Sequence, residues 1–121
     1  MTSKMLEEAL SSADVVGHQL HALDERLPAL AERLRQLDPQ LAITVARGSS
    51  DHAANYFAYL CMQRLGVPVA SLPMSLVTLR QSPLKVRGQV ALAFSQSGQS
   101  PDLVDTQRAL RERGVLSIAL V

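Results

Sequence analysis

Residues 90–101 have the sequence VALAFSQSGQSP, which is the clearest indication of fold class in the chain. Its first five residues form a continuous apolar run, which is typical of a strand buried on both faces of a parallel sheet. Hydroxyls, a carboxamide and a glycine follow, and a helix is predicted to begin at Pro101 with Ser100 as its N-cap. Unpaired amides and the dipole at a helix start favour an anion. Because the loop has no Lys or Arg, the stretch predicts a phosphate site built from oriented dipoles.

Composition excludes several function classes. The chain has 121 residues, enough for about one domain, and 47% of them are hydrophobic. Its net charge of +1 gives no broad attraction to nucleic acid or to a membrane surface. One cysteine excludes an internal disulfide and a CxxC metal site. No apolar run approaches a membrane span, and no signal peptide is evident. We therefore expect a cytoplasmic protein without metal, cofactor, nucleic acid or membrane partner.

Residues 5–37 carry a helical heptad pattern. One row of apolar residues recurs every seven positions, and a second row interleaves with it: Leu6, Ala13, Leu20, Leu27 and Leu34, then Ala9, Val16, Leu23, Leu30 and Leu37. Because Pro28 removes a backbone donor, the pattern favours two helices over one coiled-coil helix, with the break near Asp24. The apolar stripe either packs on the rest of the chain or forms a homodimer interface.

Strands and helices alternate after Pro39. Apolar strands are predicted over 41–46, 67–72, 89–95 and 115–121, and helices over 51–65 and 101–113, with a short helix near 76–80. Strands that are apolar throughout, with helices between them, indicate a parallel α/β sheet. The chain thus divides into an N-terminal helical segment, 1–38, and an α/β domain, 39–121. Since the sequence stops at its last strand, we expect it to be the front part of a longer protein.

Two hydroxyl-rich loops follow the first and third strands. With sheet order 2-1-3-4, Gly48-Ser49-Ser50 and residues 95–100 face one ligand at the topological switch point. Gly48 and Gly98 permit positive φ, and Ser97 and Ser100 can donate to phosphate oxygens alongside the amides of 97–100. Asp102 must then point away or hold a loop amide. Either loop alone is also typical of an ordinary N-cap.

Other motifs indicate a function less clearly. No GxGxxG follows the first strand and no GxxxxGK[ST] occurs, which excludes the common nucleotide sites. His18 and His21 share a helix face without a third metal ligand. His52, early in a helix that faces the crevice, can reach substrate. Cys61 is predicted to lie in the core, and the sequence leaves open whether Arg47 pairs with a carboxylate or reaches the ligand.

The segments RGSSDHA, GVPV and SQSGQSPD, placed on this strand–helix pattern, resemble the sugar isomerase (SIS) domain family over residues 40–121. The first SIS domain of the isomerase half of glucosamine–fructose-6-phosphate aminotransferase is similar, and two-SIS-domain glucosamine-6-phosphate deaminases resemble the chain best. The resemblance implies a flavodoxin-like three-layer sheet of five parallel strands, four of them present here. It also implies that Ser95, Gln96, Ser97 and Ser100 hold the sugar phosphate, while Gly48, Ser49 and Ser50 line the sugar site.

The implied reaction opens the sugar ring, moves a proton between C1 and C2 and releases ammonia, giving fructose 6-phosphate from glucosamine 6-phosphate. The resemblance places the catalytic groups in a second SIS domain, a C-terminal tail and a neighbouring subunit, so no catalytic residue is expected in these 121 residues. Fructosamine-6-phosphate deglycases, a non-catalytic sugar-phosphate sensor and a purely structural α/β fragment are the alternatives. A sensor of the regulator type would bring a basic recognition helix, which residues 5–37 lack.

Overall fold

The computed structural model describes residues 3–121, which divide into two compact units, one up to Asp38 and one from Pro39 to Val121. The first unit is a single helix, α1 (Lys4–Leu37). Ser3 caps its start by accepting from the Leu6 amide, and Asp38 ends it in the left-handed conformation. None of the residues of α1 is buried.

The predicted break near Asp24 is wrong, because α1 continues through Pro28. Proline removes one backbone hydrogen bond and strains the preceding turn. A break would instead leave up to four amides and four carbonyls unpaired at the new helix ends. Good helix formers lie on both sides, among them Leu27, Ala29 and Leu30, so the continuous helix is the less costly solution.

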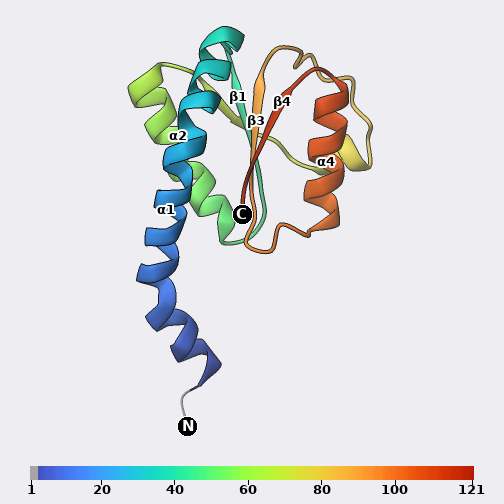
Figure 1. Cartoon of the computed structure of the whole chain (residues 1–121). Helices are drawn as coiled ribbons and strands as arrows, with labels where there is room; N and C mark the ends of the chain where they lie inside the picture. The colour runs from blue at the N-terminus through green and yellow to red at the C-terminus, as the bar shows by residue number, and fades with distance from the viewer. Residues whose placement is uncertain (1–2) are drawn as a thin grey trace. The chain divides into compact units, whose positions relative to one another are not determined.

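The second unit is built on a parallel sheet of order β2-β1-β3-β4, which confirms the predicted fold class. The strands are β1 (Ala42–Ala46), β2 (Val69–Ser71), β3 (Val90–Phe94) and β4 (Leu116–Leu120). The helices are α2 (Ser50–Leu65), α3 (Ser75–Thr78) and α4 (Pro101–Glu112). Figure 1 shows α2 and α4 on opposite sides of the sheet, as right-handed crossovers in opposite directions require. The order therefore reverses between β1 and β3.

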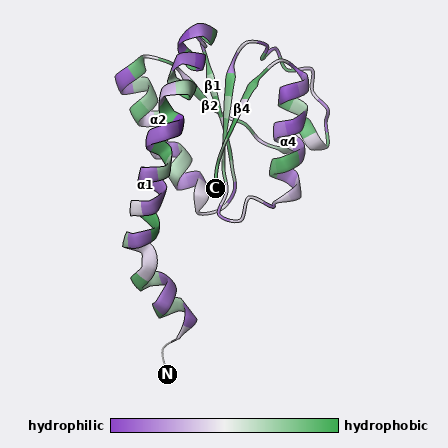
Figure 2. Cartoon of the chain, viewed as in Figure 1, coloured by the Kyte–Doolittle hydropathy of each residue, from purple (hydrophilic) through white to green (hydrophobic). Residues whose placement is uncertain are grey.

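The core lies on both faces of the two central strands, and Figure 2 shows these strands as the most hydrophobic part of the unit. All five residues of β3 are buried, as their uninterrupted apolar run predicts. On the α4 face, Ile43 and Val45 pack with Leu103 and Leu110 in one cluster. On the α2 face, the rings of Phe57 and Phe94 lie 5.8 Å apart. Burial of these aliphatic and aromatic side chains positions both helices, and hence the loops that precede them.

Candidate functional site

The loops after β1 and β3 begin side by side, because Ala46 pairs with Phe94 at the carboxyl ends of these parallel strands. They enclose a pocket of about 180 Å³, which we call the cradle pocket. Its lining residues come from both loops and from the first turn of α4: Arg47, Ser49, Ser50, Ser95, Gln96, Ser97, Ser100 and Leu103. The sequence predicted this meeting of two loops at the switch point, and the structure brings them together.

Six of the seven residues predicted for the site line the cradle pocket, and Gly48 is the exception. Gly48 has φ +61° and turns the chain between Arg47 and Ser49. Its contribution is therefore conformational, since this φ is unfavourable for a residue with a side chain. Two further residues line the pocket. The sequence leaves open whether Arg47 pairs with a carboxylate or reaches the ligand, and Leu103, which the sequence does not single out, is one of the buried residues of α4.

Hydrogen bonds within the loop 95–100 hold its shape. The Gly98 amide donates to Oγ of Ser95 at 2.9 Å, and the Gln99 amide donates to Oγ of Ser97 at 3.2 Å. These two amides are therefore engaged inside the loop, in contrast to the prediction that the amides of 97–100 all face a ligand. A hydroxyl that accepts a hydrogen bond keeps its own O–H as a donor. Ser95 and Ser97 can thus still donate to a ligand while they hold the loop.

The first turn of α4 is open at the cradle pocket. Ser100 occupies the N-cap position with extended backbone angles, as predicted, but its side chain makes no capping hydrogen bond. The first helical bond runs from the Val104 amide to the Ser100 carbonyl at 3.0 Å. Because Pro101 has no N–H, the amides of Asp102 and Leu103 are the unpaired donors of this turn. The Ser100 hydroxyl and these amides form a set of donors without acceptors.

The first turn of α2 differs from that of α4, although it also begins at the cradle pocket. The amides of Asp51 and His52 donate to the carbonyls of Gly48 and Ser49, both at 3.2 Å. Oγ of Ser50 donates to the Arg47 carbonyl at 2.6 Å. These bonds use two amides and one hydroxyl that an anion would need, although Oγ of Ser49 makes no capping bond. The α4 side of the pocket is therefore the better place for a negative charge.

Arg47 and Asp102 form an ion pair through Nη1 and Oδ2. The prediction that Asp102 holds a loop amide is wrong, because its carboxylate binds the guanidinium of Arg47 from the other loop. Asp102 does not line the cradle pocket, whereas Arg47 does. The pairing offsets the negative charge that Asp102 would otherwise bring to the open start of α4.

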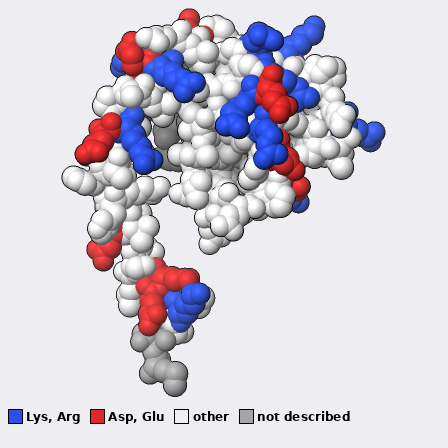
Figure 3. Space-filling model, turned by 45° about the vertical axis from the view of Figure 1, so that its right-hand side comes forward, with Lys and Arg blue, Asp and Glu red and all other residues white. Residues whose placement is uncertain are grey.

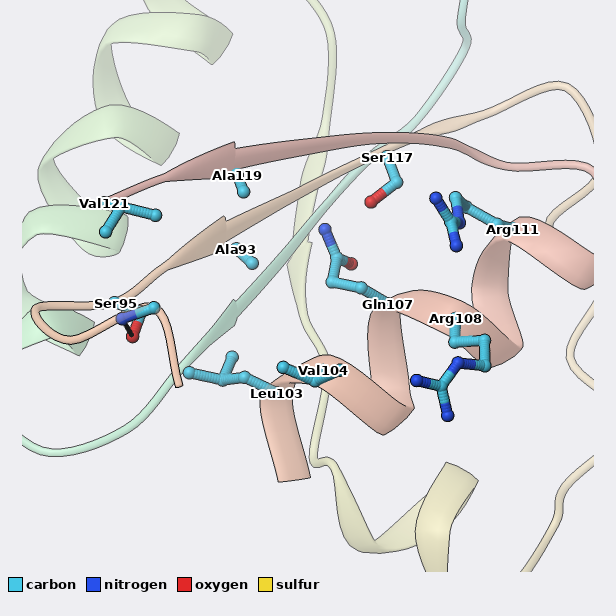
Figure 4. A pocket seen from close by; sticks show the side chains of 11 residues that line it. Ala93, Ser95, Leu103, Val104, Gln107, Arg108, Arg111, Ser117, Ala119 and Val121 are labelled. Atoms are coloured by element: carbon cyan, nitrogen blue, oxygen red, sulfur yellow. Dashed lines mark hydrogen bonds between the residues drawn. The ribbon is translucent and has the colours of Figure 1, made fainter. Parts of the chain in front are cut away.

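A second hollow, of about 220 Å³, lies between α4 and strands β3 and β4. Figure 4 shows Ala93 and Ala119 on its floor, with Gln107 reaching from α4 towards the strands and Arg108 and Arg111 at its rim. The side-chain nitrogen of Gln107 donates to the carbonyl of Ile118 at 3.2 Å. This hollow shares Ser95 and Leu103 with the cradle pocket, but Ser100 and the loop after β1 do not line it.

The remaining candidates lie outside the cradle pocket. His52 is exposed and does not line it. Nδ1 of His18 lies 2.8 Å from the Asp14 carbonyl within α1. Among residues 3–121, no group of three or more His, Cys, Asp or Glu side chains is placed to hold a metal ion. Cys61 is in the core with 6% of its surface exposed, and this burial raises the pKa of its thiol. Within the described part of the chain, no helix is both long and apolar enough to cross a bilayer.

Comparison with known proteins identifies the family. The family model of the SIS domain matches residues 38–121, and the chain belongs to this family. A crystal structure of a presumed phosphosugar isomerase from Silicibacter pomeroyi DSS-3 is 36% identical, with a TM-score of 0.90 over 98% of this chain. The match covers 36% of that protein, so the chain spans about a third of its length. No curated protein matches the chain.

Two more distant structures share the fold. The C-terminal domain of glucosamine-fructose-6-phosphate aminotransferase from Francisella tularensis is 23% identical, with a TM-score of 0.62 over 75% of this chain and 26% of its own. The tagatose-6-phosphate ketose/aldose isomerase from Escherichia coli is 22% identical, with a TM-score of 0.63 over 84% of this chain and 29% of its own. These likenesses concern the arrangement of the sheet and helices.

Proposed function

We propose that the cradle pocket binds the phosphate group of a sugar phosphate, with the donors at the start of α4 as its principal contacts. The observation that carries the proposal is the uncapped Ser100 hydroxyl together with the unpaired amide of Leu103, both from residues that line the cradle pocket. An anion is the ligand that satisfies several converging donors and the helix dipole together. The phosphosugar isomerase similar to this chain over nearly its whole length supports a phosphorylated sugar as the source of that anion.

The size of the cradle pocket limits what it holds. At about 180 Å³ it is smaller than the roughly 300–1,000 Å³ of typical small-molecule sites. A phosphate group fits this volume, whereas a whole sugar phosphate extends beyond it. We propose that the sugar lies along the loop of Gly48, Ser49 and Ser50, on the β1 side of the pocket. Further walls of the sugar site then come from other parts of a longer protein, as the two-SIS-domain resemblance implies.

The chemistry that we propose for the longer protein is aldose–ketose isomerisation with loss of ammonia, which converts glucosamine 6-phosphate to fructose 6-phosphate. Such a reaction needs a general base that titrates near neutral pH. The cradle pocket is lined by hydroxyls, a carboxamide, a guanidinium and an apolar side chain, without a carboxylate or an imidazole. The proposed role of these residues is therefore to bind and orient the substrate, and we expect no ammonia release from the 121-residue chain.

We further propose that the protein works as a cytoplasmic homodimer. The apolar stripe of α1 supports this idea, because large side chains along it are exposed, with Leu6 at 46%, Leu20 at 59% and Leu27 at 47%. A second copy of the helix would cover such a stripe. Sedimentation equilibrium of the wild type and of Leu20→Glu tests the dimer, which the charged variant is expected to dissociate.

Thermal unfolding with glucosamine 6-phosphate tests the binding proposal. A ligand at about 100 times its dissociation constant adds about 2.7 kcal/mol to the free energy of unfolding. We expect stabilisation by the sugar phosphate and none by unphosphorylated glucosamine, with inorganic phosphate as a second probe. Ser100→Ala should lose most of the effect without disturbing the loop, because the Ser100 hydroxyl makes no capping bond.

Ser117→Ala is the matched control, since Ser117 lines the second hollow and not the cradle pocket. It removes the same hydroxyl from the same unit and should leave the stabilisation unchanged. Equal stabilisation by glucosamine and glucosamine 6-phosphate would contradict the phosphate assignment. Loss of the effect in both serine variants would contradict its location at α4.

A further inference from the structure

The ion pair between Arg47 and Asp102 is unlike the others in the described residues. The pairs Arg35–Glu32 and Arg108–Asp105 each lie within one helix, at a separation of three residues. Arg47 and Asp102 are 55 residues apart in the chain, on the loop after β1 and in the first turn of α4. This pair therefore spans the switch point, where the two loops of the cradle pocket meet.

The two partners stand in different relations to the cradle pocket. Arg47 lines it and Asp102 does not. Oγ of Ser50 donates to the Arg47 carbonyl, which ties the backbone of Arg47 to the start of α2. The side chains are 61% and 50% exposed, so neither is enclosed by the protein. A guanidinium has five N–H donors, and the contact with Asp102 is made through Nη1. Arg47 can thus serve a second acceptor in the pocket.

The charges at the start of α4 determine how this ion pair affects the binding of a phosphate. The helix dipole and the unpaired amides favour a phosphate dianion there, while the carboxylate of Asp102 in the same turn opposes it. Arg47 supplies the compensating positive charge, and a bound phosphate competes with Asp102 for it. Figure 3 shows Lys and Arg side chains interspersed with Asp and Glu side chains on this face of the molecule. The arginines of α4, Arg108 and Arg111, lie farther along the helix and do not line the cradle pocket.

We propose that Arg47 selects a dianionic ligand in the cradle pocket, and that Asp102 weakens this selection by competing with the ligand for the guanidinium of Arg47. This inference rests on the proposed phosphate site, and it predicts the direction in which each substitution changes the affinity for glucosamine 6-phosphate. In Asp102→Asn, the restraint and the opposing charge are both removed, so the affinity for glucosamine 6-phosphate rises. In Arg47→Ala, the carboxylate stands uncompensated near the phosphate, so the affinity falls. In the double variant the two changes oppose each other, and the affinity returns towards that of the wild type.

Isothermal titration of the 121-residue chain with glucosamine 6-phosphate measures these changes. For one unit charge within a helical turn of the ligand, we expect each single variant to change the dissociation constant by about three- to tenfold, in opposite directions. The difference between the variants should shrink in high salt, because these groups are exposed to solvent. Unphosphorylated glucosamine distinguishes this role from a structural one. A substitution that merely disturbs the pocket would change the affinity for both ligands, whereas loss of the ion pair should change the affinity for glucosamine 6-phosphate alone.

The pair Arg108–Asp105 provides matched controls on the same helix. Arg108→Ala and Asp105→Asn make the same two charge changes farther from the start of α4, and neither residue lines the cradle pocket. We expect the affinities of both control variants to stay within about twofold of the wild type, because neither residue lines the cradle pocket or contacts Arg47, and their charges are exposed to solvent. Circular dichroism melts of all the variants check that each is folded.

The outcomes separate this inference from the function on which it rests. Opposite shifts for Arg47→Ala and Asp102→Asn, without shifts in the controls, support the inference. Wild-type binding of glucosamine 6-phosphate with weaker binding by Asp102→Asn leaves the proposed function intact and overturns the inference, because Asp102 would then assist the ligand. Equal affinities for the wild type and both single variants overturn it too. If no folded variant binds glucosamine 6-phosphate or inorganic phosphate, both proposals are wrong.

Discussion

Gly98 holds the loop of the cradle pocket in a left-handed backbone conformation, and replacing it should both destabilise the fold and weaken ligand binding. Its φ is +69°, and a Cβ at this position would lie 3.0 Å from Cγ1 and 3.3 Å from Cγ2 of Val121. Gly66 has a φ of +67°, ends α2 outside the cradle pocket and has nothing within 4 Å of its ideal Cβ. Gly66→Ala is therefore the matched control for Gly98→Ala, with the same backbone strain and open surroundings.

The expected magnitudes follow from these two environments. A left-handed φ costs an L-residue about 1–2 kcal/mol, and the smaller entropy of alanine in the unfolded chain returns about 0.4–1 kcal/mol. Gly66→Ala should thus lower the free energy of unfolding by about 0.5–1 kcal/mol. Gly98→Ala adds the contact with Val121, whose side chain is 65% exposed and can rotate away. The added cost stays below the overpacking penalty of a core, about 1–3 kcal/mol, and we expect about 1–2 kcal/mol in total.

Urea unfolding of the wild type and of the Gly66→Ala and Gly98→Ala variants measures these differences, and Gly98→Ala combined with Val121→Ala isolates the contact. The double variant should return to the cost of Gly66→Ala, because it keeps the strain and removes the clash. Of the two single variants, only Gly98→Ala should bind glucosamine 6-phosphate more weakly, since the Gly98 amide is bonded to Ser95 Oγ within the loop. If Gly98→Ala cost no more than Gly66→Ala and bound the ligand as the wild type does, this reasoning would be refuted.

Two further predictions concern the buried side chains of the α/β unit. Thr106 and Leu110 are both fully buried on α4, and Oγ1 of Thr106 has no hydrogen-bond partner in the described residues. Leu110→Ala should destabilise by about 2–5 kcal/mol in urea unfolding, whereas Thr106→Val should stabilise by about 1 kcal/mol; a destabilising valine would show that the hydroxyl has a partner. Because burial raises the pKa of the Cys61 thiol, the folded state retains that proton when the unfolded state has lost it, so stability should fall as pH rises above the ordinary value of 9.0. Cys61→Ala should remove this part of the pH dependence, and an unchanged slope would show that other groups cause it.

The fold could be predicted from sequence to a large extent because its strands carry an unusually clear pattern. The five residues of β3 are all apolar and all buried, and the helix from Pro101 ends near the predicted residue, at Glu112. The second strand was predicted too long, as 67–72 against the observed Val69–Ser71. Only three residues there pair with β1, and Pro68, which has no backbone N–H to contribute to the sheet, directly precedes them.

Local sequence pattern gave wrong predictions where several small contributions to the free energy compete. The sequence around Pro28 shows one residue that opposes a helix, but the continuity of α1 depends on the sum over both flanking segments. The serines of the loop 95–100 were predicted to face a ligand, yet two of their hydroxyls also hold the loop amides. Serine can bond its own backbone neighbours as readily as a ligand, and the residue type alone does not distinguish the two.

Local sequence pattern was sufficient to predict the alternation of apolar strands with helices after Pro39 and the hydroxyl-rich loops at the carboxyl ends of β1 and β3. These features follow from hydrophobic periodicity and turn chemistry, which act between near neighbours. The pairing of Arg47 with Asp102, and the difference in bonded amides between the first turns of α2 and α4, became visible in the folded chain alone. These outcomes depend on distances between residues far apart in the chain, which exist only once the sheet has brought the two loops together.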